Sequence, residues 1–182
     1  MPRTRTELER DAKVAQIAQA AERRLREGGY DALSVAAIAR ELGVAQNAIY
    51  WYFPSKDDLF VAALEGMLRR IAARKPKGPD VGLVERVLWF TDQFQALSQL
   101  RAAMSERARE SPTVARFVTD LDALLSRMLT NAFRERVPDE RLPLAVETFR
   151  ATVEGTFVKG LSKRERHKVL TFALEQLLGG GR

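Results

Sequence analysis

Residues 34–60 read SVAAIARELGVAQNAIYWYFPSKDDLF and hold three short helical patterns in succession. The first pattern has apolar residues at the spacing of one helix face, namely Val35, Ile38 and Leu42. Ser34 precedes this pattern, and a serine at that position caps a helix N-terminus. Gly43 follows it and permits the sharp turn that ends the helix, because glycine tolerates a positive φ.

The second pattern carries a polar and aromatic face. Ile49 and Phe53 are one turn apart and share an inward face, since residues advance by about 100° along a helix. The outward positions are Gln46, Asn47, Tyr50 and Trp51. Amides and aromatic rings suit the hydrogen-bonding edges and methyl groups of DNA base pairs. A helix, a turn at glycine and this second helix therefore predict a helix-turn-helix.

The third pattern begins after Pro54, which stops the second helix. Ser55 and Asp58 have the spacing of a capping box, which predicts a new helix from Ser55 to about residue 74. Lys56 lies in its first turn, where an ammonium and free backbone N–H groups can face one phosphate.

These segments resemble the TetR family of bacterial transcriptional regulators. The resemblance is carried by residues 43–44, 48–53 and 55–60, with 34–39 before them. It implies an all-α fold: an N-terminal DNA-binding domain and a helical C-terminal domain that dimerises and often holds a ligand pocket. The chain departs from the family pattern at Ala45, Asn47 and Tyr52, where Ser, Gly and His are common. These departures bear on the operator sequence and leave the expected fold unchanged.

On this reading the DNA-binding residues have two roles. Gln46, Asn47 and Trp51 are expected at base edges, where they would read sequence. The expected phosphate contacts, which set register, are Ser34, Tyr50, Tyr52 and Lys56. The tyrosine at position 52 is ambiguous, because its ring can belong to the core with only its hydroxyl outside.

Composition excludes several classes of protein. The chain has 182 residues, no cysteine and one histidine, so disulfides, thiol catalysis and a histidine-based metal site are not expected. No apolar run is long enough to span a membrane, and the N-terminus lacks a signal sequence, so we expect a cytoplasmic protein. Neither a catalytic constellation nor a cofactor motif is present, and we predict no enzyme activity and no cofactor.

Charge alone does not argue for DNA. The net charge is +6, but residues 1–60 hold nine Lys/Arg and nine Asp/Glu, so the basic excess lies elsewhere. Arg3 and Arg5 belong to a predicted N-terminal arm, which either follows the DNA backbone or is a solvated tail. His167 lies among lysines and arginines, and we expect it to be solvated.

About nine helices are expected in two domains. Residues 1–54 form the predicted DNA-binding domain, the helix at about 55–74 links the domains, and 75–182 form the predicted dimerisation and ligand-binding domain. Residues 76–79 are expected to be a loop. The helices predicted after it span about 80–98, 100–110, 112–136, 142–161 and 163–178.

The last two helices are candidates for a homodimer interface, because their apolar residues occupy more than one side and glycines interrupt the first of them. Each glycine in a lone helix costs about 1 kcal/mol against alanine, and the close approach of another helix would offset that cost. The candidate interface residues are Val153, Thr156, Phe157, Gly160, Leu170, Leu174 and Leu177. The alternative is that these helices only close the core of one chain. A C2 dimer would bind a palindromic operator.

A hydrophobic or aromatic small-molecule effector is the other expected partner, since the resemblance implies a pocket. The candidate lining residues are Trp89, Phe90, Gln93, Phe94, Met104, Phe117, Met128 and Phe149. For each of them a plain core position is the alternative. A regulator without such an effector, controlled by a protein partner, is the alternative at the level of function.

Overall fold

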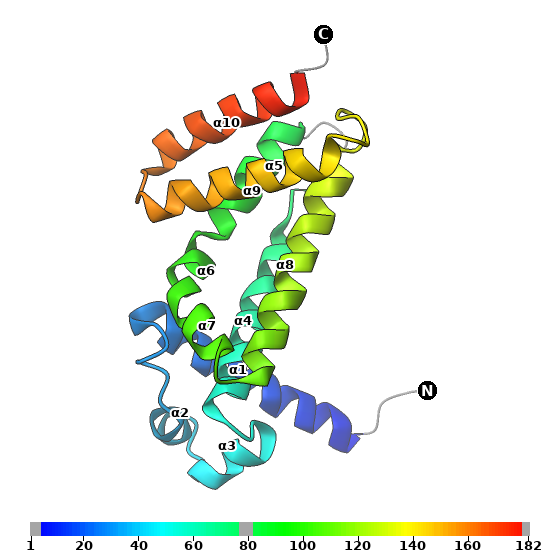
Figure 1. Cartoon of the computed structure of the whole chain (residues 1–182). Helices are drawn as coiled ribbons and strands as arrows, with labels where there is room; N and C mark the ends of the chain where they lie inside the picture. Colours follow the sequence, from blue (N-terminus) through cyan, green and yellow to red (C-terminus); the bar gives the residue numbers. More distant parts are fainter. Residues whose placement is uncertain (1–4, 77–81, 180–182) are drawn as a thin grey trace. The chain divides into compact units, whose positions relative to one another are not determined.

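The computed structural model describes residues 5–76 and 82–179, apart from the side chains of residues 5 and 6. Within these residues the protein has ten α-helices and no strand, which confirms the predicted all-α fold (Figure 1). Contacts divide the chain into two compact units. The first holds the residues up to Arg74 together with Gln99–Val118, and the second holds Lys75–Ser98 and Thr119–Arg182.

The first unit is built around the helix-turn-helix. Its helices are α1 (Arg5–Gly28), α2 (Val35–Glu41), α3 (Gln46–Tyr52), α4 (Lys56–Arg74) and α7 (Arg101–Ala108). The helix α1 packs against α4, and α2 packs against α3. Each of the first four helices contributes at least one fully buried aliphatic or aromatic side chain, among them Ile17, Ile38, Ile49 and Phe60. The short α2 and α3 are therefore held by burial of one apolar face against longer helices.

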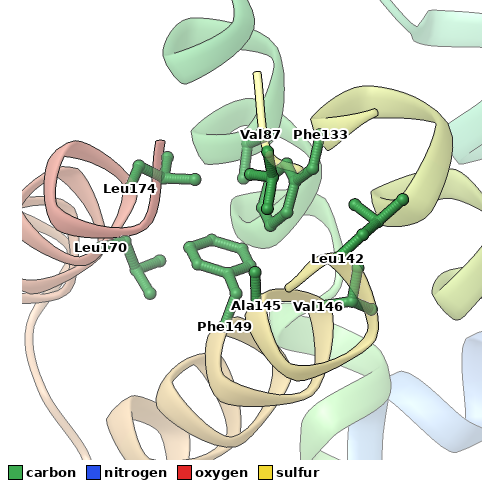
Figure 2. Close-up of a cluster of buried hydrophobic side chains, with 9 residues drawn as sticks. Val87, Phe133, Leu142, Ala145, Val146, Phe149, Leu170 and Leu174 are labelled. Carbon is green, nitrogen blue, oxygen red and sulfur yellow. The ribbon is translucent and has the colours of Figure 1, made fainter. Parts of the chain in front are cut away.

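The second unit contains α5 (Leu83–Gln93), α9 (Leu142–Val158) and α10 (Lys163–Gly179). The helices α9 and α10 run side by side, and α10 also packs against α5. Figure 2 shows the core at this junction, where Phe149 lies edge-on to Phe133 with ring centroids 5.7 Å apart. Leu170 and Leu174 of α10 belong to the same buried cluster. A continuous apolar core thus fixes α9 and α10 within one chain.

The division between the two units falls within two helices, α6 (Gln95–Gln99) and α8 (Pro112–Phe133), so each of them has residues in both units. The single helix predicted for about 80–98 is wrong in detail, because α5 and α6 are separate helices. Phe94 lies between them at φ −77° and ψ −5°, and its N–H still bonds to the Phe90 carbonyl at 3.0 Å. The break between α5 and α6 is therefore a single tighter turn at Phe94 in an otherwise continuous helical course.

Some predictions lie outside the described residues: Arg3 of the N-terminal arm and most of the loop at 76–79. The helix α1 already includes Arg5 at its first position. The contacts divide the chain after Arg74, and Gln99–Val118 groups with the first unit. The assignment of DNA binding and dimerisation to two domains stays a prediction. Along 5–76 and 82–179, every helix is too short or too polar to cross a membrane.

Candidate DNA-binding surface

The turn between α2 and α3 forms as its sequence requires. The Ser34 hydroxyl accepts a bond from the Ala37 N–H at 3.2 Å and caps α2. Gly43 has φ +64°, a value that side-chain-bearing residues rarely adopt. The Val44 N–H then bonds back to the Ala39 carbonyl at 3.0 Å, which closes the end of the helix. This turn sets the angle at which α3 leaves α2.

The helix α3 has one buried and one exposed face, as predicted. Ile49 is fully buried, and Phe53 directly after the helix is buried as well. The side chains of Gln46, Asn47, Tyr50 and Trp51 are all exposed. Trp51 is 67% exposed, which is unusual for the largest apolar side chain in a protein. The exposed face of α3 therefore presents amide and aromatic groups together.

Tyr52 occupies the border of that face. Its side chain is half-buried, and its ring lies edge-on to the ring of Trp51 with centroids 4.7 Å apart. Such edge-to-face pairs are favourable because the ring edges are positive and the faces negative. Tyr52 thus packs against the Trp51 ring and helps to fix its orientation.

The start of α4 has the predicted capping box. The Ser55 N–H donates to Asp58 Oδ2 at 2.9 Å, and the Asp58 N–H donates to Ser55 Oγ at 3.1 Å. Lys56 is half-buried, and its ammonium lies 4.1 Å from the centroid of the Tyr30 ring. This cation–π contact holds the ammonium at the N-terminus of α4, where an anion is favoured.

Asp57 lies in the first turn of α4, where acidic side chains are common at the surface, but here the acid is buried. Its side chain is buried, with 8% of the residue exposed. Arg107 of α7 donates two hydrogen bonds to its carboxylate, from Nε to Oδ1 at 3.1 Å and from Nη2 to Oδ2 at 2.8 Å. These bonds from Arg107 hold the pKa of Asp57 below its ordinary value, so the carboxylate is charged.

Arg10 is a second residue that the sequence pattern did not single out for this surface. Its guanidinium lies 5.3 Å from the centroid of the Trp51 ring. Arg10 is exposed on α1, far from Trp51 in sequence. The contact adds a positive charge beside the exposed indole and restricts the orientation of that ring.

The residues predicted to line a ligand pocket do not lie in a single unit. Met104 and Phe117 are buried in the first unit, whereas the other six belong to the second. Phe149 is part of the apolar core of the second unit. The half-buried residues of the set are Trp89, Phe90, Gln93, Phe94 and Met128. The first two have their rings edge-on, with centroids 5.0 Å apart.

Several residues predicted for a dimer interface are covered by the chain itself. Leu170 and Leu174 are completely buried, and Thr156 is 3% exposed. Val153 and Leu177 pack against the same core, and Phe157 lies under the guanidinium of Arg166. Gly160 is exposed but forms the turn after α9, with φ +62°. The chain itself thus covers Thr156, Leu170 and Leu174, and these three side chains are not available to a second copy. The other four residues are half-buried or exposed, and their place in a dimer interface stays a prediction.

The exposed apolar residues of the two helices occupy other positions. They are Leu144 and Val158 on α9, and Val169 and Phe172 on α10. On α9 these two share one helix face with Thr148, Ala151 and Gly155, because the steps between them are four, three, four and three residues. We call Leu144, Thr148, Ala151, Gly155, Val158, Val169 and Phe172 the outer face.

His167 was expected to be solvated, and this is wrong. Its Nε2 lies 2.9 Å from Oδ2 of Asp92, and the residue is half-buried. Lys163 also reaches Oδ2 at 2.9 Å, and Arg166 reaches Oδ1 at 2.8 Å. Burial raises the pKa of Asp92, but the bonds from these three partners outweigh it, so the pKa is lowered overall. This cluster joins α5 to α10.

Comparisons with known proteins agree with this geometry. Residues 17–63 match the model of the bacterial regulatory proteins of the tetR family. An HTH-type transcriptional repressor of Mycobacterium tuberculosis is 28% identical over 72% of this chain and 70% of its own length. The HTH-type transcriptional repressor KstR of Rhodococcus jostii is 29% identical over 62% of this chain, and the match spans only 56% of that repressor.

The fold comparison extends over nearly the whole chain. The crystal structure of a transcriptional regulator from Rhodococcus has a TM-score of 0.76 at 19% identity, and it covers 92% of this chain and 96% of that one. The matched segment, residues 17–63, includes the whole of α2 and α3 with their exposed polar and aromatic face. Residues 17–63 are therefore similar to the DNA-binding segment of the bacterial regulatory proteins of the tetR family, and the chain is a DNA-binding transcriptional regulator rather than an enzyme.

Proposed function

We propose that the protein is a transcriptional repressor that binds a palindromic operator as a homodimer, with α3 in the major groove. One observation carries this proposal: the exposed face of α3 presents Gln46, Asn47, Tyr50 and Trp51 side by side, opposite the buried Ile49. Amides pair with adenine edges, and an indole packs on a thymine methyl group. Repression follows if the bound protein blocks the polymerase, as the names of the matched repressors suggest.

The other contacts would fix register on the DNA backbone. Tyr50 and Tyr52 bring hydroxyl groups to the edges of α3, and Lys56 brings a charge to the start of α4. Ser34 caps α2 through its hydroxyl oxygen, which leaves the hydroxyl hydrogen free to donate to a phosphate. Arg10 would add a further phosphate contact beside Trp51.

Selection of bound duplexes from random DNA tests this function. We expect an inverted repeat to be enriched, because a C2 dimer presents α3 to two half-sites about one helical turn apart. Gln46→Ala is expected to relax the preference at particular bases, with a loss of about 1–3 kcal/mol of discrimination at those positions. Tyr50→Ala is expected to weaken binding to all duplexes while the enriched motif stays the same.

Two results would contradict the proposed role of α3 in DNA binding. If no duplex is enriched even at low salt, or if Gln46→Ala and Tyr50→Ala both leave the motif and the affinity unchanged, α3 does not read DNA. An exposed position on the same unit, Gln19 on α1, provides the matched control. Gln19→Ala should change neither motif nor affinity.

We also propose that a hydrophobic or aromatic small molecule regulates the protein through the second unit. The support is a group of aromatic residues on and directly after α5, Trp89, Phe90 and Phe94, that the unit covers only in part. Partly covered rings can exchange solvent for the face of an aromatic ligand. A ligand that binds one conformation better shifts the population toward it and so changes operator affinity.

Thermal melting against a panel of aromatic compounds tests the effector proposal. A ligand at 100 times its Kd is expected to stabilise the folded protein by about 2.7 kcal/mol, which raises Tm. Phe90→Ala should abolish the shift, and the same ligand should lower operator affinity in the wild type. A panel that shifts no melting curve, or a shift that Phe90→Ala leaves intact, would contradict this assignment.

A further inference from the structure

The contact between Asp57 and Arg107 joins two helices that the sequence separates by 50 residues. Both bonds run in parallel from one guanidinium to one carboxylate, and such bidentate pairs fix geometry as well as energy. The Tyr30 hydroxyl donates to Asp57 Oδ1 at 2.7 Å. All three residues lie in the first unit. Asp57 is therefore held from two sides, by α7 and by the loop after α1.

The same residues hold the cation that we assign to a DNA phosphate. The ammonium of Lys56 lies 4.1 Å from the centroid of the Tyr30 ring. The guanidinium of Arg107 lies 5.6 Å from that centroid. Phe60 lies edge-on to Tyr30, with ring centroids 5.0 Å apart. A chain of direct contacts thus leads from Arg107 through Asp57 and Tyr30 to Lys56.

Asp57 is not needed to cap α4. The capping box of Ser55 and Asp58 already caps α4 by accepting the N–H groups of these two residues. The Asp57 side chain instead points sideways to Arg107 and Tyr30. A partly buried ion pair of this kind contributes little net stability, because its charges lose much of their water. The bonds to Asp57 therefore matter most for the geometry that they impose on the first turn of α4.

The outer side of Arg107 has one further partner. Its Nη1 donates to Glu110 Oε2 at 2.7 Å, and Glu110 is exposed. Burial and the bond to Asp57 raise the pKa of Tyr30 to about 12, so its hydroxyl remains a donor at neutral pH. Asp57 is thus a charged acceptor and Tyr30 a protonated donor, as these contacts require.

We propose that Arg107 is a positioning residue of the DNA-binding surface: its paired bonds to Asp57 hold the first turn of α4 and the Tyr30–Lys56 contact in the geometry that brings Lys56 to a phosphate. The inference rests on the proposed DNA-binding role of Lys56 and adds a residue from α7 that does not itself touch DNA. Sequence is read by α3, so Arg107 should govern affinity and leave base preference alone.

The test compares operator binding of the full-length wild type, Arg107→Gln and Lys56→Gln over a range of salt concentrations, on the duplex enriched from random DNA. We expect Arg107→Gln to lose about tenfold in affinity, within the usual range for energetic coupling between sites. Its enriched motif should match that of the wild type. The slope of log K against log salt should become shallower by about two, because each protomer of the dimer loses one phosphate contact.

The double variant separates positioning from a general loss of stability. In the Lys56→Gln background, Arg107→Gln should cause little further loss, because both changes remove the same contact. Arg109→Gln is the matched control, since it removes the same charge from an exposed arginine two residues away. It should bind DNA as the wild type does. Circular dichroism and sedimentation check that every variant is folded and has the wild-type oligomeric state.

Two results would overturn the inference. One is wild-type affinity and salt slope in a folded Arg107→Gln. The other is a tenfold loss that is just as large in the Lys56→Gln background. If Arg107→Gln does not fold, Asp57→Asn gives the same comparison, because the amide keeps the shape and loses the charge. A wild type that enriches no duplex would instead contradict the proposed function itself.

Discussion

Phe172→Glu is expected to leave the protein monomeric and to abolish tight binding to an inverted-repeat duplex. Phe172 is 63% exposed on α10, and Val158 is 68% exposed on α9. Exposed apolar side chains of this size on neighbouring helices mark an interaction surface. In a C2 dimer each substitution occurs twice, and each new carboxylate would be buried against the partner without a counter-charge.

The expected loss of operator affinity is at least about 100-fold. Specific binding exceeds non-specific binding by about 10³ to 10⁷, and a monomer keeps the contacts of only one half-site. Sedimentation velocity measures the oligomeric state, and a titration of labelled duplex measures the affinity. Leu124→Glu is the matched control, because Leu124 is an exposed leucine on a different helix, α8. A Phe172→Glu protein that remains dimeric would place the interface elsewhere.

Gly155 gives an independent check of the same interface. A Cβ built on Gly155 meets nothing within 4 Å in the single chain. In a monomer, Gly155→Ala should therefore stabilise α9 by about 1 kcal/mol. If a second copy packs closely on the outer face, the added methyl group should instead weaken the dimer. A raised dimer dissociation constant in Gly155→Ala would indicate that a second copy packs closely on the outer face. An unchanged constant would indicate that it does not.

The parts of the fold that could be predicted are those set by neighbouring residues. Ser34, Gly43 and the Ser55–Asp58 capping box each act within a few positions of the chain, and all three perform the local roles expected of them. The exposed face of α3 follows from helical periodicity alone once Ile49 is assigned to the core. Local chemistry therefore predicts the helix-turn-helix well.

The contacts that could not be predicted join residues far apart in sequence. Arg107 and Asp57 are 50 residues apart, and Arg166 and Asp92 are 74 apart. A charged residue on an amphipathic helix is usually solvated, and periodicity does not reveal which one is buried with a partner. The buried members of the predicted dimer interface, Thr156, Leu170 and Leu174, have a related cause. The helices α9 and α10 are apolar on more than one side, so the pattern alone did not distinguish the chain's own core from the outer face.

Asp92→Ala is expected to destabilise the second unit strongly. It removes the carboxylate that pairs with Arg166, and Arg166 is only 1% exposed. The remaining partner of its Nη2 is Gln95 Oε1 at 3.3 Å, and its Nε is buried without a partner among the residues that the structure describes. Leaving a buried charge unpaired typically costs about 3–5 kcal/mol. We expect a loss of about 3 kcal/mol in the free energy of unfolding.

Chemical denaturation at a fixed protomer concentration measures this loss, because dimerisation makes stability depend on concentration. Asp122→Ala is the matched control: Asp122 pairs with Arg150, whose side chain is 24% exposed and which also donates to Ser126 Oγ at 2.7 Å. Water can solvate the arginine left behind there, so the expected cost is about 1 kcal/mol or less.

A double variant decides whether the cost comes from the orphaned charge. Asp92→Leu combined with Arg166→Met removes both charges and keeps apolar volume at the crossing of α5 and α10. Replacing a whole buried pair in this way is often neutral or stabilising, so most of the lost stability should return. If the double variant is as unstable as Asp92→Ala, the pair is needed for the packing of α10 itself. Equal losses in Asp92→Ala and Asp122→Ala would show that burial of Arg166 carries no special penalty.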